Sequence, residues 1–510
     1  MFRSSHRTRL AVGLVTALAL AGCSAGQTTT SPDVGPGGVR TDVIIAVALE
    51  PVNLDFTTTS GAAIPQLLMN NVYETLVKID QDGGIVPLLA TSWEMSDDGT
   101  EYTFHLRRGV TFSDGRPFTS ADVVASFDRV QTHWIRSQLT LPMAVVDHTE
   151  ALDDYTVRVT LHRPSNEWLF SIGTLLGAIF PAEIDFDKMT EAIGTGPYVV
   201  AERQQGDRIV LTGREDHWAG PAPLRQVTFR YITDPTAAVN ALRAGDVDML
   251  LTTGDRIAPL SNANFQVIEG TSNGEVLLSF NNRIAPFDDL RVRQAFAYAI
   301  DREAVMEVAS GGFGTLLGAM VPPTDPFFED LSGMFPFDPD RARELLAEAG
   351  YGERDAGLEP LRIAFDVPNI GYATTSAELI VSHLADVGVN ATIRILEFPL
   401  WLDQVFNRHD FQMSIVMHIE ARDLMTVLQP NYYLGFDNSV VGPLAAAADA
   451  GSFEEYVEGM REVARLIAAE VPGLVLYLSP NLIVADPALT GIKPNAVTES
   501  LDLTALSWTK

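Results

Sequence analysis

The chain has 510 residues, of which 46% are hydrophobic, and it carries a formal net charge of −31 at pH 7. A chain of this length is longer than one hydrophobic core usually supports, so two or more domains are expected. The negative charge repels phosphate backbones and anionic lipid head groups, which argues against nucleic acid or the bilayer itself as a partner.

The first 22 residues predict a lipoprotein signal peptide. Arg3, Arg7 and Arg9 form a basic start, residues 10–20 are apolar, and two small residues precede Cys23. Cys23 is the only cysteine of the chain, so an intramolecular disulfide is excluded. We therefore expect cleavage before Cys23 and lipidation of Cys23; an ordinary signal peptide with an incidental cysteine is the alternative.

Residues 23–40 are predicted to be a flexible tether, because Gly, Pro, Ser and Thr dominate and few apolar side chains are present. No later segment reaches the roughly 18 uninterrupted apolar residues of a membrane-spanning helix. The expected location is extracytoplasmic, with a lipid anchor as the only membrane contact. In a two-membrane cell this is the periplasmic side.

Short alternating segments in the body predict strands at residues 42–49, 101–109 and 155–163. In residues 96–100 an Asp-Asp-Gly turn is expected to pair residues 93–95 with residues 102–104. Strands interleaved with helices indicate an α/β or α+β fold, without a visible repeat.

The predicted helices carry local start and stop signals. A capping box at residues 119–122 starts one helix, and Asp234-Pro235 starts another that stops at Gly245. Asp338-Pro339 starts a helix ending near residue 350, and Asp288 or Asp289 caps a helix with apolar residues at four-residue spacing.

Residues 270–274 match the G-x-S-x-G pattern of a hydrolase nucleophile elbow, with Ser272 as the nucleophile. That motif needs a helix after the serine, whereas both flanks here predict strands, so we interpret the glycines as a hairpin turn. A secreted serine hydrolase is therefore the unfavoured alternative. No metal-ligand spacing, phosphate loop or dinucleotide fingerprint is present, so we expect no enzyme activity, no cofactor and no metal.

Six segments of the chain form a pattern that is informative as a set. The longest, at residues 88–130, begins with LLATSWEMSDDGTEYTFHLRRGV and ends with ADVVASFDRV. The others are residues 71–77, 194–198, 242–250, 280–305 and 337–351. In order and spacing they resemble the extracytoplasmic solute-binding proteins that serve peptide and nickel ABC importers, known as family 5. The resemblance extends from residue 42 to the C-terminus.

This resemblance implies an α/β, two-lobed periplasmic-binding-protein fold of type II, cluster C, with the ligand enclosed between the lobes. Lobe I would comprise residues 41–61, 191–281 and 480–510, and lobe II residues 282–479. An extra subdomain, residues 62–190, would be inserted in lobe I. Hinge closure around a ligand suits capture and delivery.

Candidate ligand contacts follow from the same resemblance. In peptide-binding relatives an aspartate of lobe II holds the α-amino group, and Glu420 occupies the corresponding position, while Met417 replaces a frequent tryptophan. Strand alternation would place His418, Glu420 and Arg422 on one face, where Glu420 and Arg422 could hold a zwitterion. The alternative is an internal ion pair that shapes the loop, either Glu420–Arg422 or Arg422–Asp423.

Aromatic side chains and one further carboxylate complete the candidate site. Trp401 and the pair Tyr432-Tyr433 are candidate apolar walls or core residues, and Glu50 is a weaker candidate after the first strand. The expected function is a non-enzymatic, monomeric receptor that delivers a short peptide to an ABC permease. A nickel chelate, haem or another small solute is the alternative ligand.

Overall fold

The computed structural model describes residues 38–59, 62–134, 140–252, 254–256, 260, 264–352, 357–422, 424–429 and 431–509. The predicted leader, Cys23 and most of the tether lie outside these residues. Arg40, the last residue of the predicted tether, forms ion pairs with Asp42 and Asp248 at 3.0 and 2.6 Å. Arg40 is therefore in contact with the folded body.

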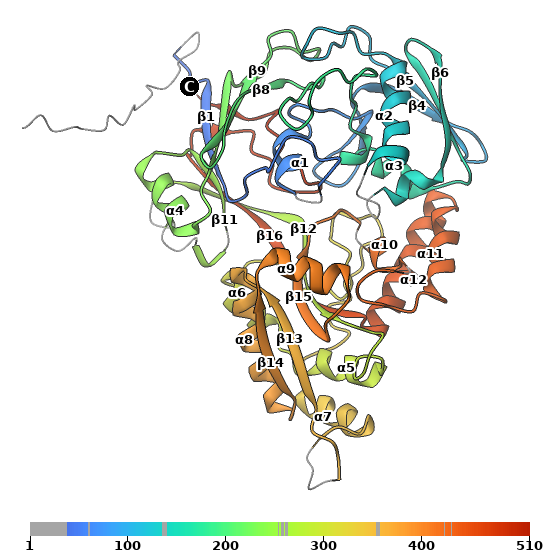
Figure 1. The fold of residues 1–510 in the computed structure, drawn as a ribbon, viewed down its shortest axis with the longest axis vertical. Helices are drawn as coiled ribbons and strands as arrows, with labels where there is room; N and C mark the ends of the chain where they lie inside the picture. The colour runs from blue at the N-terminus through green and yellow to red at the C-terminus, as the bar shows by residue number, and fades with distance from the viewer. Residues whose placement is uncertain are drawn as a thin grey trace, which may run out of the picture.

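Ten of the described strands form one mixed sheet, in the order β14-β13-β15-β12-β16-β11-β1-β10-β9-β8. Their bounds are β1 Asp42–Val47, β8 Tyr198–Gln204, β9 Arg208–Gly213, β10 Gln226–Tyr231, β11 Met249–Thr252, β12 Gln266–Phe280, β13 Arg362–Pro368, β14 Asn390–Leu396, β15 Met413–His418 and β16 Gly473–Ala485. In Figure 1 the half that contains β8, β9 and α1 lies above, the half that contains β13, β14 and α7 lies below, and β12 and β16 run between them.

The long strands β12 and β16 are the crossing segments between the two halves. The start of β12 pairs with the end of β16 beside β11, and its end pairs with the start of β16 beside β15. The pairing shifts register between Gly270 and Gly274. The predicted hairpin at residues 270–274 is therefore wrong, because these residues form an irregularity inside one continuous strand.

The predicted inserted subdomain contains a second, four-stranded sheet of order β4-β5-β7-β6. Its strands are β4 Ala90–Met95, β5 Glu101–Leu106, β6 Val146–Asp153 and β7 Thr156–Leu161. Trp93 lies opposite Phe104 and Met95 opposite Tyr102, as the Asp-Asp-Gly turn predicts. Two small ladders pair β2 Val77–Ile79 with β3 Ile85–Pro87, and β17 Leu489–Thr490 with β18 Ser507–Trp508.

The predicted helix signals are confirmed. Thr119 and Asp122 form the capping box of α2, Asp234 and Gly245 flank α4, and Asp338 and Asp289 cap α7 and α5. The α-helices are α1 Ala63–Leu68, α2 Ser120–His133, α3 Asn166–Ser171, α4 Pro235–Ala244, α5 Leu290–Ala299, α6 Arg302–Ser310, α7 Pro339–Glu348, α8 Gly371–Asp386, α9 Phe398–Trp401, α10 Leu424–Val427, α11 Val441–Asp449 and α12 Phe453–Glu470. Short 3-10 segments are η1 Leu141–Val145, η2 Leu175–Gly177 and η3 Gly254–Arg256, and a π-helical turn is η5 Leu402–Asn407.

The hydrophobic cores follow the two halves. One large core joins buried residues of predicted lobe I with those of the inserted subdomain, from Val43 to Leu506. Two others fill predicted lobe II on either side of its part of the sheet. In the part of the chain that the structure describes, no helix has the length and apolarity to cross a membrane.

Candidate functional site

Two cavities share one lining residue, Glu499, and the first of them lies at the crossing strands β12 and β16. The first, called the crossing cavity, has a volume of about 260 Å³. Its lining includes Ser272 to Gly274, Met417, Ile419, Ser479 to Asn481, and residues 492, 493 and 495–503. The second, called the subdomain cavity, has a volume of about 410 Å³ and lies between residues 142–176 of the inserted subdomain and residues 420–429 of lobe II. Glu499 lines both. Together they fall within the size range of small-molecule sites.

Glu420 lies on the wall of the subdomain cavity. β15 ends at His418, and Glu420 follows in the turn, half-buried, with one carboxylate oxygen accepting the N–H of Ile419 at 3.2 Å. Glu499, which the sequence analysis missed, is a second half-buried carboxylate on the same cavity. Its position depends on the C-terminal segment returning from residue 480, which local sequence patterns do not reveal.

Arg422 is not paired with Glu420. Its guanidinium contacts Glu167 at 3.1 Å and Asp325 at 3.7 Å, and it lies 3.7 Å from the ring centroid of Phe170. The predicted alternation fails beyond His418, because the backbone leaves the strand there and Arg422 has φ 56°. Asp423, the other predicted partner, lies outside the described residues.

Arg422, Glu167, Asp325 and Tyr456 form a buried polar cluster, called here the Arg422 cluster. Glu167 accepts the Tyr456 hydroxyl, and Arg422 also donates to that hydroxyl at 3.2 Å. Burial raises the pKa of Asp325 to about 7, although Arg422 draws it down. Burial of Arg422 opposes its charge, but Glu167 and its other neighbours raise its pKa above the ordinary value. Two carboxylates thus share one cation.

A second contact between the inserted subdomain and lobe II lies beside this cluster. Asp449, at the end of α11, accepts the hydroxyl of Ser165, the N–H of Glu167 at 2.9 Å and the guanidinium of Arg163 at 2.6 Å. In Figure 1, α11 and α12 rise toward α3 on the same side of the molecule. Asp449 therefore caps the first turn of α3 from the other lobe.

His418, Trp401 and Tyr433 lie in the core and line neither cavity. The His418 ring lies between two tyrosines, with Nδ1 and Nε2 each 3.0 Å from the hydroxyls of Tyr432 and Tyr433. The indole of Trp401 donates to Ser414 at 2.8 Å and is 2% exposed. Of the two readings of Trp401 and the tyrosine pair, the structure supports core packing.

Glu50 also lies apart from both cavities. Its carboxylate accepts the N–H of Gly206 at 2.9 Å, in the turn between β8 and β9. Its contact is therefore with a neighbouring turn of lobe I.

Ser272 has the surroundings of a structural serine. Its hydroxyl donates to the carbonyl oxygen of Ser479 at 2.5 Å and accepts the N–H of Gly274 at 2.9 Å, across the register shift of the crossing strands. Its flanks belong to one strand, so the strand-to-helix turn of a nucleophile elbow is missing at this position.

Gly270→Ala is expected to destabilise the protein by about 1–3 kcal/mol, because the new methyl group overpacks the crossing segments. Its Cβ would lie 1.9 Å from the carbonyl oxygen of Pro494, which is backbone and has little room to move. Gly274→Ala is the control, since its nearest contacts are the side-chain ends of Ser272 and Met417 at 3.0 and 3.1 Å. Thermal denaturation compares the stability of the two variants. An equal loss of stability in both would contradict the close approach of Gly270 to the backbone of Pro494.

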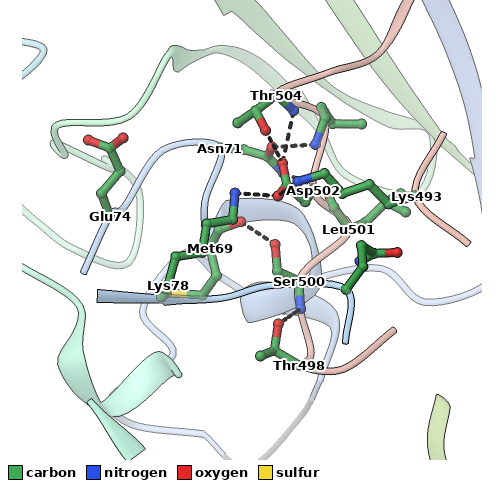
Figure 2. A network of polar contacts seen from close by, with 12 residues as sticks. Met69, Asn71, Glu74, Lys78, Lys493, Thr498, Ser500, Leu501, Asp502 and Thr504 are labelled. Carbon is green, nitrogen blue, oxygen red and sulfur yellow. Dashed lines mark hydrogen bonds and ion pairs between the residues drawn. The ribbon is translucent and has the colours of Figure 1, made fainter. Parts of the chain in front are cut away.

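The far wall of the crossing cavity carries a charged network that the sequence analysis did not single out. Lys78 and Lys493 both form ion pairs with Asp502, and Figure 2 shows the two ammonium groups approaching one carboxylate. Burial alone would raise the pKa of Asp502, but the lysines hold that pKa well below its usual range. Among the described residues, no group of three or more His, Cys, Asp or Glu side chains has a metal-binding arrangement.

Comparisons with known proteins agree with the predicted family and fold. Residues 84–434 match the family model described as bacterial extracellular solute-binding proteins, family 5 Middle. Heme-binding protein A of Haemophilus influenzae is 34% identical over 351 residues, which cover 62% of this chain and 63% of that relative. The chain thus spans a little under two thirds of the length of that relative.

Another relative and a solved structure match a larger share of this chain. Glutathione-binding protein GsiB of Shigella dysenteriae serotype 1 is 32% identical over 408 residues, or 78% of this chain and 75% of that protein. The oligopeptide-binding protein AppA of Bacillus subtilis, solved with a nonapeptide, superimposes with a TM-score of 0.78 at 20% identity, covering 94% of this chain and 100% of AppA. The chain therefore belongs to the bacterial extracellular solute-binding proteins of family 5, a family of non-enzymatic receptors.

Proposed function

We propose that this protein is the substrate-binding lipoprotein of an ABC importer, and that it captures a short peptide or a similar amine-bearing zwitterion. Lobe I, the inserted subdomain and lobe II, with the boundaries predicted from the sequence, would close on the ligand. Cys23 would carry the lipid anchor, and a permease would receive the ligand.

The observation that carries this proposal is the pair of carboxylates on the subdomain cavity. Glu420 belongs to lobe II and Glu499 to the C-terminal return of lobe I, and both are half-buried in its wall. A ligand ammonium between them gains charge-assisted hydrogen bonds, which are roughly twice as strong as neutral ones. The similarity to a glutathione-binding protein and to AppA, which was solved with a nonapeptide, supports an amine-bearing ligand.

Glu420→Gln is expected to weaken peptide binding at least about tenfold, because the amide cannot carry the charge that pairs with an ammonium. Glutamine keeps an oxygen for the N–H of Ile419, so the turn should be preserved. Titration calorimetry with a defined mixture of tripeptides and tetrapeptides measures the change.

Glu50→Gln is the matched control, because it removes the same charge from a carboxylate that contacts Gly206. Its affinity for the peptide mixture should equal that of the unmodified chain. An unchanged dissociation constant in Glu420→Gln would remove Glu420 from the site, and a haem or metal-chelate adduct would favour the alternative ligand.

A further inference from the structure

Lysine is rare in this protein, and two of its lysines meet at one carboxylate. The chain has four lysines among 35 basic residues: Lys78, Lys188, Lys493 and Lys510. Lys78 belongs to β2, and Lys493 belongs to the C-terminal return more than 400 positions later, yet their ammonium groups meet at Asp502. In a chain with a net charge of −31, this pairing concentrates positive charge at one place.

One carboxylate serves both ammonium groups. Asp502 Oδ2 contacts Lys78 and Lys493, while Oδ1 accepts the backbone N–H and the hydroxyl of Thr504 at 2.9 and 2.5 Å (Figure 2). Among the described residues, neither lysine has a second carboxylate within ion-pair distance. The cluster therefore holds one positive charge in excess.

That excess charge faces the crossing cavity through Lys493. Lys493 and Asp502 line the cavity, and the Lys493 side chain is 27% exposed, compared with 15% for Lys78 and 9% for Asp502. Asp80 also lines the cavity, but one of its carboxylate oxygens accepts two N–H groups of its own turn, from Asp82 and Gly84. Burial lowers the pKa of Lys78, Asp502 raises it and Lys493 lowers it further, as expected for two cations sharing one partner.

We propose that Lys493 binds a carboxylate of the ligand, with Lys78 neutralising Asp502 so that the Lys493 ammonium remains available. This deepens the proposed function and rests on it, since Lys493 supplies a cationic group for the ligand's carboxylate, while the carboxylates Glu420 and Glu499 would hold the ligand's ammonium. Glu499 lines both cavities, so the two cavities are neighbours. A zwitterion would lie with its ammonium in the subdomain cavity and a carboxylate in the crossing cavity.

Lys493→Met tests this assignment without leaving a buried charge unpaired, because Asp502 keeps Lys78 as its partner. The probes are a defined mixture of tripeptides and tetrapeptides with free ends, the same peptides as C-terminal amides, and the same peptides with acetylated N-termini. Native mass spectrometry and titration calorimetry measure binding. Lys493→Arg serves as the conservative variant, and thermal denaturation checks that both variants fold.

The unmodified chain should bind free acids at least about tenfold more tightly than amides. Lys493→Met should lose the preference for free acids while binding amides as before. Lys493→Arg should keep much of that preference. Equal binding of acids and amides by the unmodified chain, or an equal loss for both in Lys493→Met, would overturn the role of Lys493.

The acetylated peptides separate this inference from the proposed function. If acetylation has no effect while the Lys493→Met difference persists, the ammonium site at Glu420 fails and the carboxylate site stands. If the unmodified chain binds none of the peptides in any form, the proposed function fails and this inference falls with it.

Discussion

Arg422→Met is expected to lower the free energy of unfolding by about 3–5 kcal/mol at pH 8, because it leaves buried carboxylates without their cation. Arg422 is 7% exposed and lies between Glu167 and Asp325. Methionine also loses the cation–π contact with Phe170. Urea denaturation measures the change.

Arg408→Met is the matched control, because Arg408 pairs with Asp403 on the surface, where both side chains are more than half exposed. Exposed pairs contribute little to stability, so this variant should unfold almost as the unmodified chain does. A loss in Arg422→Met no larger than the loss in Arg408→Met would show that the Arg422 cluster does not hold the inserted subdomain and lobe II together.

Asp325→Asn is expected to make the protein more stable than the unmodified chain at pH 8 and nearly equal to it at pH 4. Burial raises the pKa of Asp325 to about 7 from 3.8. A raised carboxyl pKa means that the folded state holds a proton which the unfolded state releases, so stability is lost as pH rises from about 4 to about 7. Three pKa units correspond to up to about 4 kcal/mol.

Urea denaturation between pH 4 and pH 8 measures this difference for the two chains. Asp502 has a lowered pKa and loses its contribution as pH falls, but it is present in both chains, so its effect cancels in the comparison. Two stability curves that stay parallel across this range would contradict the raised pKa of Asp325.

The secondary structure was predictable where the signal is local. The caps of α2, α4, α5 and α7 and the turn between β4 and β5 each depend on residues within a few positions of one another. The turn predicted at residues 270–274 was wrong because the pairing of β12 depends on β16, about 200 residues later. A glycine pair within one strand has the same local pattern as a hairpin.

The candidate site was less predictable, because its residues come from distant segments of the chain. Glu420 lines the subdomain cavity, and its contact with a ligand stays a prediction. Arg422 and His418 look like surface groups in a short polar segment, but their partners Glu167, Tyr432 and Tyr433 come from other segments that bury them. Lys493 and Glu499 were not predicted as site residues, because only the folded C-terminal segment brings them to the cavities.

Asp449 and the Arg422 cluster join the predicted lobe II to the predicted inserted subdomain through buried polar contacts. In the proposed closure of the lobes around a ligand, these polar partners would come together out of water. Ligand binding and these contacts should then be coupled.

Native mass spectrometry of residues 24–510, purified from a bacterial host without unfolding, tests the central claim most directly. It measures the mass of any ligand that stays bound to the purified protein. The account predicts one or more added masses that decompose into amino-acid residues. A discrete added mass that cannot be built from amino acids, or an empty protein that no peptide mixture fills, would contradict the claim that this is a peptide receptor.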